Sequence, residues 1–497
     1  MTVTAERGSD LIGPVELARE LGLAVPTPEQ VAVIAAPVEP ALVIAGAGAG
    51  KTETMAARVV WLVANGIVAP ERVLGLTFTR KAAGQLGDRV RARLRRLAAS
   101  PLLDRLDPSG GRRAALLASD PTVLTYHAYA GRLVAEHGLR IPVEPGARPL
   151  TETAAWQLAH RVVSTWTEDI DTDKVPATIT NLVLELSGEL AEHLVDPDDL
   201  ARWTTRFVDA VENAPRAARQ RAGLPRDLQQ VLATQRLRVA LLPLLADYAR
   251  RKRRAGAVDF ADQMSLAARL ATDHPEVVSG ERSRFGAVLL DEYQDTGHAQ
   301  RVLLRALFGG SEPMPVTAVG DPVQAIYGWR GASAANLPRF ATDFPRLDRD
   351  GGSRPARQHH LLTSFRNPPE VLDLANSVSE PLRGGDASGS GSGDGDAADA
   401  DADAAVPALR VPRLRPRADA GPGAVCLALT EDVRAEREWV ASRISAEWER
   451  SVARTGAPPT TAVLVRRRAD MAGIASALRA RGLPVEVVGL GGLLDEP

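Results

Sequence analysis

The sequence is poor in the features that mark secreted and membrane-spanning proteins. Cysteine occurs once, at Cys426, which excludes an internal disulfide and a multi-cysteine metal site within the chain. The apolar stretches are short and interrupted, so no transmembrane span is expected. The first residues have neither the basic start nor the apolar run of a signal peptide. We therefore expect a protein of the reducing cytoplasm with no membrane partner.

Lysine is almost absent, although basic residues are common. Of the 60 lysines and arginines, only Lys51, Lys81, Lys174 and Lys252 are lysine. The 62 acidic residues leave a net charge of −2, which gives no general sign of a nucleic-acid partner. Hydrophobic residues make up 45% and charged residues 25%, values that exclude a mostly disordered chain. The length of 497 residues favours two to four domains.

Short apolar runs alternate with helical patterns toward both ends of the chain. This alternation predicts an α/β fold in which helices cover both faces of parallel sheets. Many runs end in Gly, Asp or Thr, which suits ligand-binding loops at the carboxyl edge of such a sheet. The runs begin near Ala41, Arg72, Thr122, Gly286, Val316, His360, Ala424, Thr461 and Val485.

Two regions depart from this alternation. The middle of the first half carries helical stripes, including Leu237, Leu241 and Leu244, with a period near 3.6, which predicts a helical insertion. A later segment contains almost only Gly, Ser, Asp and Ala, which predicts a flexible, solvated acidic loop. The predicted parts are residues 1–136 and 251–345 for the first α/β domain, 137–250 for the insertion, 346–383 and 407–497 for a second domain, and 384–406 for the loop.

The strongest motif follows the first apolar run and opens a helical pattern. It reads Ala45-Gly46-Ala47-Gly48-Ala49-Gly50-Lys51-Thr52. This is the context of a phosphate-binding loop, in which small residues let backbone N–H groups converge on phosphate oxygens at a helix N-terminus. Lys51 is predicted to reach the β- and γ-phosphates and Thr52 to bind Mg²⁺, with Glu53 next among the cofactor-binding residues. The strict pattern begins with Gly, where this chain has Ala45. The motif predicts a nucleoside triphosphate site.

A second acidic motif completes the predicted site. The run GAVLL ends in Asp291-Glu292, an arrangement that places one carboxylate near Mg²⁺ and the next beside the attacking water. Asp291 is therefore the second candidate metal ligand, and Glu292 the candidate general base. A kinase is disfavoured, because no acceptor site is evident and the pair suits activation of water.

Together these motifs resemble those of the UvrD/Rep-type superfamily 1 DNA helicases, over roughly residues 20–490. The segment Pro26-Thr27-Pro28-Glu29-Gln30 is similar to the family's adenine-reading segment, and Gln30 offers an amide donor and acceptor to the base. The resemblance implies tandem RecA-like domains with a helical insertion, the second domain being incomplete. ATP with Mg²⁺ would bind between them.

Two later motifs carry further roles by the same resemblance. In the block that runs from Gly320 to Ala332, Gln324 would sense the γ-phosphate. In Ser364-Phe365-Arg366-Asn367, Arg366 would act as an arginine finger and Phe365, where the family usually has Tyr, would stack on adenine.

Cations that hold phosphates and rings that stack on bases suit single-stranded DNA. The implied DNA contacts are Thr77, Phe78, Arg80, Thr125, His127, Trp329 and Arg330. Where this chain has Arg80 the family commonly has Asn.

Within the family, the region around residues 52–86 looks most like AdnA and AdnB, the paired helicase–nuclease subunits of actinobacteria. Their nuclease part is not found here, and the chain ends before the last two helicase motifs, so we expect a helicase cut short. The resemblance implies an ATP-dependent DNA helicase or translocase that moves 3′→5′ on single-stranded DNA, at junctions or ends, in repair or recombination.

An alternative is an ATP-binding, DNA-clamping subunit of a helicase–nuclease complex that does not unwind alone, with a second subunit as its partner. An ABC-type ATPase lacks support, because no ABC signature is recognisable.

Overall fold

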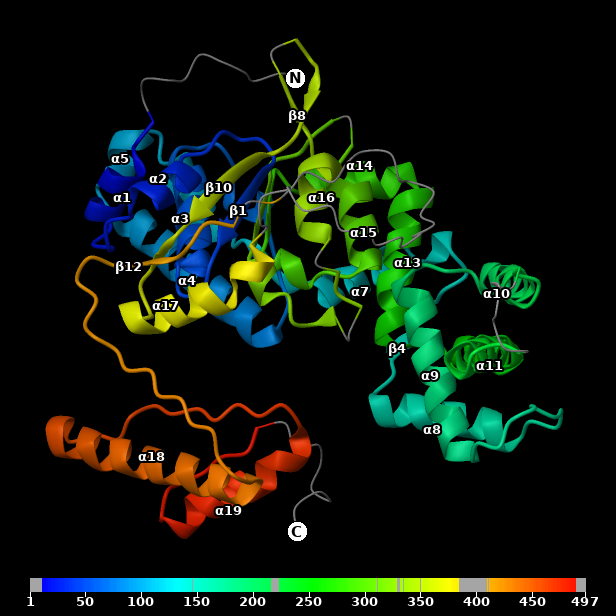
Figure 1. The fold of residues 1–497 in the computed structure, drawn as a ribbon. Coiled ribbons are helices and arrows are strands. Elements are labelled where there is room, and N and C mark those ends of the chain that lie inside the picture. Colours follow the sequence, from blue (N-terminus) through cyan, green and yellow to red (C-terminus); the bar gives the residue numbers. More distant parts are fainter. Residues whose placement is uncertain are drawn as a thin grey trace. The chain divides into compact units, whose positions relative to one another are not determined.

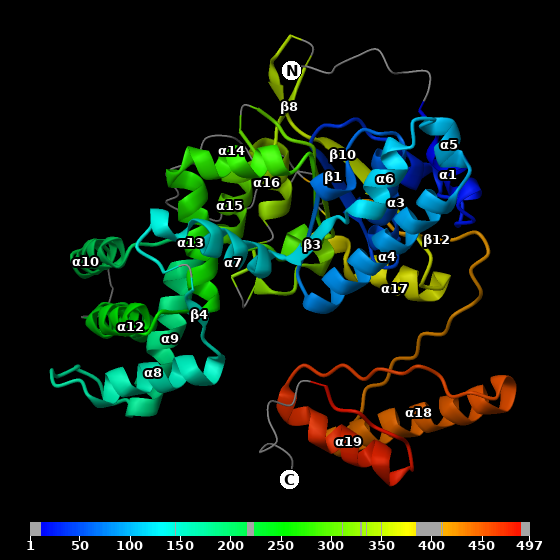
Figure 2. The same cartoon turned by 180° about the vertical axis from the view of Figure 1, so that it is seen from behind.

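The computed structural model describes residues 11–144, 146–215, 223–310, 312–328, 331–333, 335–348, 350–383, 409 and 411–488. The chain divides after Gly423 into two compact units. Figures 1 and 2 show the elements from opposite sides. The predicted acidic loop, residues 384–406, lies outside the described residues. In the described part, no helix is both long and apolar enough to span a membrane.

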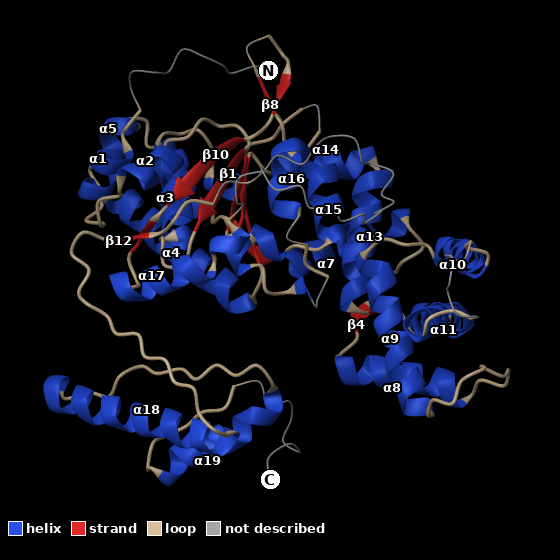
Figure 3. Cartoon of the chain, in the orientation of Figure 1, coloured by secondary structure: helices blue, strands red, loops and turns tan. Residues whose placement is uncertain are grey.

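The first unit is built on one parallel sheet, which lies at its centre in Figure 3. The strand order in the described residues is β10-β1-β7-β6-β2-β3. The strands are β1 (Ala41–Ala45), β2 (Val73–Thr77), β3 (Thr122–Thr125), β6 (Ala287–Leu290), β7 (Val316–Gly320) and β10 (Arg357–Leu361). Six of the predicted apolar runs are therefore confirmed as strands. β10, expected at the start of a second domain, instead pairs with β1 as an edge strand of this sheet, with Arg357 opposite Ala41.

Helices cover both faces of the sheet, and the alternation of side chains along β1 shows why. Leu42 and Ile44 belong to one buried cluster, whereas Val43 and Ala45 belong to another on the opposite face. The second face is covered by α1 (Pro14–Glu20), α2 (Pro28–Ile34), α3 (Lys51–Ala64), α4 (Arg80–Ala99), α5 (Leu102–Leu106) and α6 (Gly111–Ala118). The first face is covered by α7 (Tyr126–His137), α13 (Phe260–Asp273), α14 (Pro275–Arg284), α15 (His298–Phe308) and α16 (Asn336–Asp343).

The region between α7 and α13 is mainly helical and has a small core of its own, which includes Val162, Val183 and Tyr248. Its helices are α8 (Glu152–Ser164), α9 (Pro176–Glu192), α10 (Pro197–Glu212), α11 (Arg226–Ala240) and α12 (Leu242–Arg254). It is flanked by the short parallel pair β4 (Arg148–Pro149) and β5 (Ala257–Val258).

A buried lysine fixes this region to the core helices. Lys252 Nζ lies 2.6 Å from carboxylate oxygens of both Asp259 and Asp262, which form a capping box at the start of α13. One of the four lysines therefore joins two helices, since its charge is buried between carboxylates.

The last part of the first unit returns to the sheet edge. It contains the hairpin of β8 (Arg346–Leu347) and β9 (Ser353–Arg354), the parallel pair β11 (Thr363–Ser364) and β12 (Arg415–Pro416), and α17 (Pro369–Val378).

Short 3₁₀ helices occur along the whole first unit. They are η1 (Pro70–Arg72), η2 (Gly138–Arg140), η3 (Tyr293–Asp295), η4 (Pro322–Gln324) and η6 (Glu380–Leu382).

The second unit corrects the prediction of strands beyond Gly423. Its described residues form α18 (Val433–Thr455), η7 (Arg468–Asp470) and α19 (Met471–Ala480), and no strand. The runs near Ala424, Thr461 and Val485 have no neighbouring strand in this part, so their backbone groups enter no ladder. Leu427, Leu429 and Leu464 are 85%, 103% and 93% exposed. The prediction was two large parallel sheets in tandem. The described residues contain one such sheet, in the first unit.

Candidate functional site

The predicted phosphate loop joins β1 to α3 at the carboxyl edge of the sheet. Gly48 and Gly50 have φ of 75° and 78°, the left-handed region that favours glycine, and Gly50 caps α3. The loop therefore ends at a helix N-terminus, where backbone N–H groups and the helix dipole attract an anion. Lys51 is the first residue of α3, and its side chain is only 12% exposed.

The segment after β10 lies directly on this loop. The Ser364 hydroxyl donates a hydrogen bond of 2.9 Å to the Ala47 carbonyl, and the Phe365 N–H donates one of 2.9 Å to the Gly48 carbonyl. A Cβ on Gly48 would lie 2.7 Å from Ser364 Oγ and 2.8 Å from Arg366 Cβ. The structure thus brings together the phosphate loop and the two predicted residues Phe365 and Arg366.

Glu29 holds that segment in place, a role that the sequence did not indicate. Its carboxylate accepts hydrogen bonds from the N–H groups of Leu362, at 2.8 Å, and Thr363, at 3.3 Å, and it pairs with Arg415 at 2.7 Å. A single glutamate in a helix gives no such signal, because its partners are more than 330 residues away.

A cavity of about 290 Å³ adjoins the end of the loop at Gly50. Gln30 lies in its wall, and its amide Nε2 would lie 2.9 Å from a Cβ on Gly50. The Gln30 Oε1 atom accepts the Thr27 N–H at 3.0 Å as part of the capping box of α2. Phe365 is also in the wall, so the predicted base-binding residues face one mainly apolar cavity.

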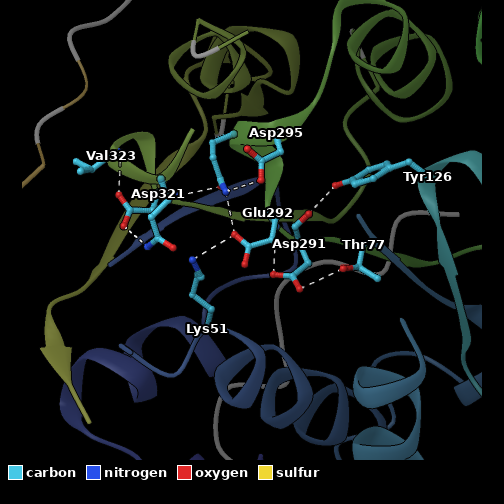
Figure 4. Close-up of polar contacts among 10 residues, drawn as sticks. Lys51, Thr77, Tyr126, Asp291, Glu292, Asp295, Asp321 and Val323 are labelled. Carbon is cyan, nitrogen blue, oxygen red and sulfur yellow. Dashed lines mark hydrogen bonds and ion pairs between the residues drawn. The ribbon is translucent and has the colours of Figure 1, made fainter. Parts of the chain in front are cut away.

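The predicted metal ligand Asp291 directly follows β6 and is 5% exposed. The Tyr126 hydroxyl donates to the Asp291 carbonyl at 2.9 Å, and the Thr77 hydroxyl lies 3.5 Å from Asp291 Oδ2. Figure 4 shows both contacts. Burial, and then the neighbouring Glu292 carboxylate, raise the pKa of Asp291 to about 6. Its ionised form therefore lacks the solvation that water or a cation would supply.

The predicted general base is held in an unusual backbone conformation. Glu292 has φ of 50°, a left-handed conformation that costs a non-glycine residue about 1–3 kcal/mol. Its Oε2 atom lies 3.2 Å from Lys51 Nζ, an ion pair drawn in Figure 4. The same atom accepts a 2.9 Å hydrogen bond from the Gln294 side chain. Lys51 and Glu292, predicted from motifs about 240 residues apart, therefore form an ion pair at the mouth of the phosphate loop.

The predicted phosphate sensor is linked to this base through polar groups. The Gln324 amide donates to Asp321 at 2.5 Å, and the Asp321 N–H donates to Gln294 Oε1 at 3.0 Å. The same Gln294 amide contacts Glu292 and Asp295, and burial raises the pKa of Asp295 to about 6. Sequence reasoning missed Gln294 and Asp321, because their roles depend on contacts between two loops.

Residues that fit Mg²⁺ are present at this edge. A phosphate-bound Mg²⁺ takes one or two protein ligands, so the buried, incompletely solvated Asp291 together with Thr52, the second residue of α3, forms a suitable set. No cluster of three or more His, Cys, Asp or Glu side chains that could hold a metal by itself occurs among the described residues.

One predicted DNA contact differs in the structure. Thr77 is fully buried and its hydroxyl faces Asp291, so its side chain supports the carboxylate site and does not reach the surface. Its neighbour Phe78 is partly exposed and stacks on Tyr327, with ring centroids 5.0 Å apart and planes at 29°. The sequence did contain an indication that the Thr77 side chain points inward, because Thr77 is the last residue of a buried strand.

The other predicted DNA contacts lie at helix starts. Arg80 is exposed at the first turn of α4. The Thr125 side chain caps α7 by accepting the Ala128 N–H at 3.1 Å, and His127 packs edge-on against Phe260. Trp329 and Arg330 lie outside the described residues.

Comparisons with known proteins match the chain to one family over most of the first unit. The profile of the UvrD/REP helicase N-terminal domain matches residues 26–345. The ATP-dependent DNA helicase PcrA of Leuconostoc citreum is 28% identical over 340 residues, 68% of this chain and 37% of that protein. UvrD2 of Mycobacterium tuberculosis (strain ATCC 25618 / H37Rv) is 31% identical over 362 residues, 72% of this chain and 43% of that protein. UvrD1 of Mycobacterium leprae (strain TN) is 28% identical over 362 residues, 71% and 39% of the two chains. The chain spans less than half the length of these relatives.

Proposed function

The chain belongs to the UvrD/Rep helicase family, and from this membership we propose that it hydrolyses ATP to move along single-stranded DNA in the 3′→5′ direction, at junctions or ends that arise in repair or recombination. The observation that carries the proposal is the assembly at one sheet edge of the phosphate loop, the Lys51–Glu292 pair and the segment that bears Arg366.

The ion pair between Lys51 and Glu292 suggests how nucleotide binding starts the reaction. Lys51 neutralises the base in the structure, and a bound γ-phosphate would compete for its ammonium group. Glu292 would then be free to accept a proton from the attacking water as the water oxygen bonds to the γ-phosphorus. The bond to the β–γ bridging oxygen breaks, and ADP leaves with the electron pair. Thr52 and Asp291 would hold Mg²⁺, which would neutralise charge on the phosphates.

The hydrogen-bonded side chains from Glu292 through Gln294 and Asp321 to Gln324 would transmit the state of the γ-phosphate toward the bound DNA. Gln324 and Tyr327 belong to the same loop, and Tyr327 stacks on Phe78. A change in Gln324 when the γ-phosphate leaves would shift this aromatic pair, whose rings would stack on bases. Alternation between a nucleotide-bound and a nucleotide-free arrangement would grip and release the strand.

The test compares substitutions at two of the four lysines in the chain. Lys51→Ala should abolish DNA-stimulated ATP hydrolysis, because the phosphate-binding ammonium is lost, while circular dichroism shows the fold unchanged. Lys174→Ala, at an exposed position between α8 and α9, is the matched control and should retain the activity. Retained DNA-stimulated hydrolysis in Lys51→Ala would refute the proposal.

A second candidate is a subunit that binds ATP and clamps DNA beside a second helicase–nuclease subunit. The exposed leucines of the unit after Gly423, in runs that pair with no strand in the described residues, favour dependence on a partner. Single-turnover unwinding measured beside DNA-stimulated ATPase distinguishes the two. Hydrolysis without unwinding supports the clamp, whereas unwinding by the chain alone supports the motor.

A further inference from the structure

The end of α9 brings the helical insertion onto the segment that follows Asp291 and Glu292. Leu194 has φ of 54°, a left-handed conformation that is strained for a residue with a side chain, and it packs against the core on the first face of the sheet. Beside it, the rings of His193 and His298 stack with their centroids 6.5 Å apart. A strained turn of this kind persists only where its surroundings determine it, so the end of α9 has a fixed place.

Glu192, the last residue of α9, lies between two glycines that are distant from it in the sequence. A Cβ on Gly297 would collide with Glu192 Oε1, and a Cβ on Gly331 would lie 2.6 Å from Glu192 Cγ. Gly297 has φ of −90°, which any residue can adopt, so the space that Glu192 takes, and not the backbone conformation, requires a glycine there. Burial raises the pKa of Glu192 to about 7, which favours a neutral carboxyl in this narrow space.

The two glycines lie where the loop that carries Tyr327 meets the start of α15. Gly297 forms an antiparallel β-bridge with Ala332, the residue that follows Gly331. The Ala332 N–H donates to the Tyr327 carbonyl at 3.3 Å, so the loop closes on this bridge. Glu192 therefore packs against the base of the loop, and a movement of α9 would reach the loop directly.

We propose that Glu192 is a positioning residue, through which the helical insertion holds the loop of Tyr327 in the arrangement that binds single-stranded DNA. The inference rests on the proposed function, because that function gives the loop its contact with DNA. Tyr327 stacks on Phe78 with ring centroids 5.0 Å apart, so the position of the loop decides whether this aromatic pair forms. Glu192 acts here through its volume, because it lies against glycines and burial favours its neutral form.

The functional test measures ATP hydrolysis by the full chain as the concentration of a single-stranded oligonucleotide is raised. Glu192→Ala should raise the KM for DNA by about 2- to 30-fold, the range typical of a residue that couples two parts of a protein. The kcat at saturating DNA should be retained, because the phosphate loop and Glu292 are unchanged. Glu192→Gln should behave like the wild type, because the amide has the same shape and is neutral.

The matched control is Glu189→Ala, which removes an exposed glutamate from the same end of α9. The Glu189 carboxylate is 61% exposed and lies 3.7 Å from Arg238, within the insertion. This variant should leave both the KM for DNA and kcat unchanged.

A pair of substitutions tests the contact itself. Gly297→Ala should lower the urea midpoint of unfolding, because the new Cβ meets Glu192. The same change made in Glu192→Ala should have a smaller effect, since the space is then vacant. An equal effect of Gly297→Ala in both backgrounds would overturn the inference.

The remaining outcomes separate this inference from the proposed function. A wild-type KM for DNA in Glu192→Ala would overturn the inference while the proposed function stands. So would a KM for DNA that rises in Glu192→Gln as much as in Glu192→Ala, since volume would not then be the cause. Failure of single-stranded DNA to stimulate the wild type would instead refute the proposed function.

Discussion

Replacing Asp291 with Asn should stabilise the nucleotide-free protein at neutral pH. Asp291 is 5% exposed and lies beside Glu292, so ionising it in the folded state is unfavourable. Burial raises its pKa from 3.8 to about 6. Asn has nearly the same shape and removes the charge. Its oxygen can accept from the Glu292 N–H, and its NH₂ group can donate to the Thr77 hydroxyl.

The magnitude follows from the pKa difference. The difference between 3.8 and about 6 corresponds to about 3 kcal/mol of unfolding free energy. Because the folded-state pKa is the higher one, this contribution stabilises the fold below about pH 4 and is lost as the pH rises through about 6. Between low pH and pH 8, the free energy of unfolding of the wild type should therefore fall by this contribution. That of Asp291→Asn should not, because the variant has no carboxyl group at this position.

The assay is urea unfolding at pH 5 and pH 8, with EDTA and without nucleotide. The stability advantage of Asp291→Asn should be larger at pH 8 than at pH 5, by about 1 kcal/mol. Asp88→Asn, at a carboxylate that is 79% exposed, is the control and should show no such change. Addition of Mg²⁺ and nucleotide should stabilise the wild type more than Asp291→Asn. An equal difference at both pH values, or a less stable variant at pH 8, would refute the reasoning.

Three further predictions address the loop, the base and the aromatic pair. Glu292→Gln should lower kcat for ATP hydrolysis by about 10²- to 10⁴-fold with ADP affinity retained, and a normal rate would exclude Glu292 as the base. Gly48→Ala should lower the free energy of unfolding by about 1–3 kcal/mol, because its φ is 75° and the new Cβ would meet Ser364 Oγ; an unchanged urea midpoint would contradict the close approach. Phe78→Ala should weaken binding of single-stranded DNA by about 10- to 100-fold, since it removes one ring of the stack with Tyr327; unchanged fluorescence anisotropy titrations would show that this pair is structural.

The sequence predicted the parts of the site that depend on local pattern. The strand, glycine-rich turn and helix around Lys51 are contiguous, and Asp291-Glu292 ends a buried run, so both could be placed at a sheet edge. The pairing of β10 with β1 could not be predicted, because strand order depends on packing between distant segments.

The residues that were missed or misplaced share one physical cause. Glu29, Gln294 and Asp321 act through contacts with segments distant in the sequence, which leave no periodic signal. Thr77 was assigned to DNA because hydroxyl groups suit phosphate, yet its position at the end of a buried strand turns it inward. The apolar runs after Gly423 have strand-like composition, but a strand also needs a neighbour to bond with, and none is present in the described part of that unit.

The place of β1 in the sheet has a consequence for biosynthesis. Ala41 lies between Thr317 and Arg357, so the strand that carries the phosphate loop leaves the ribosome long before either of its neighbours. At about 5–20 residues per second, β1 must wait roughly 15–60 s for its first partner. During this interval its unpaired backbone and apolar side chains are open to aggregation, so we expect newly made chains to depend on chaperones until β7 and β10 have been translated.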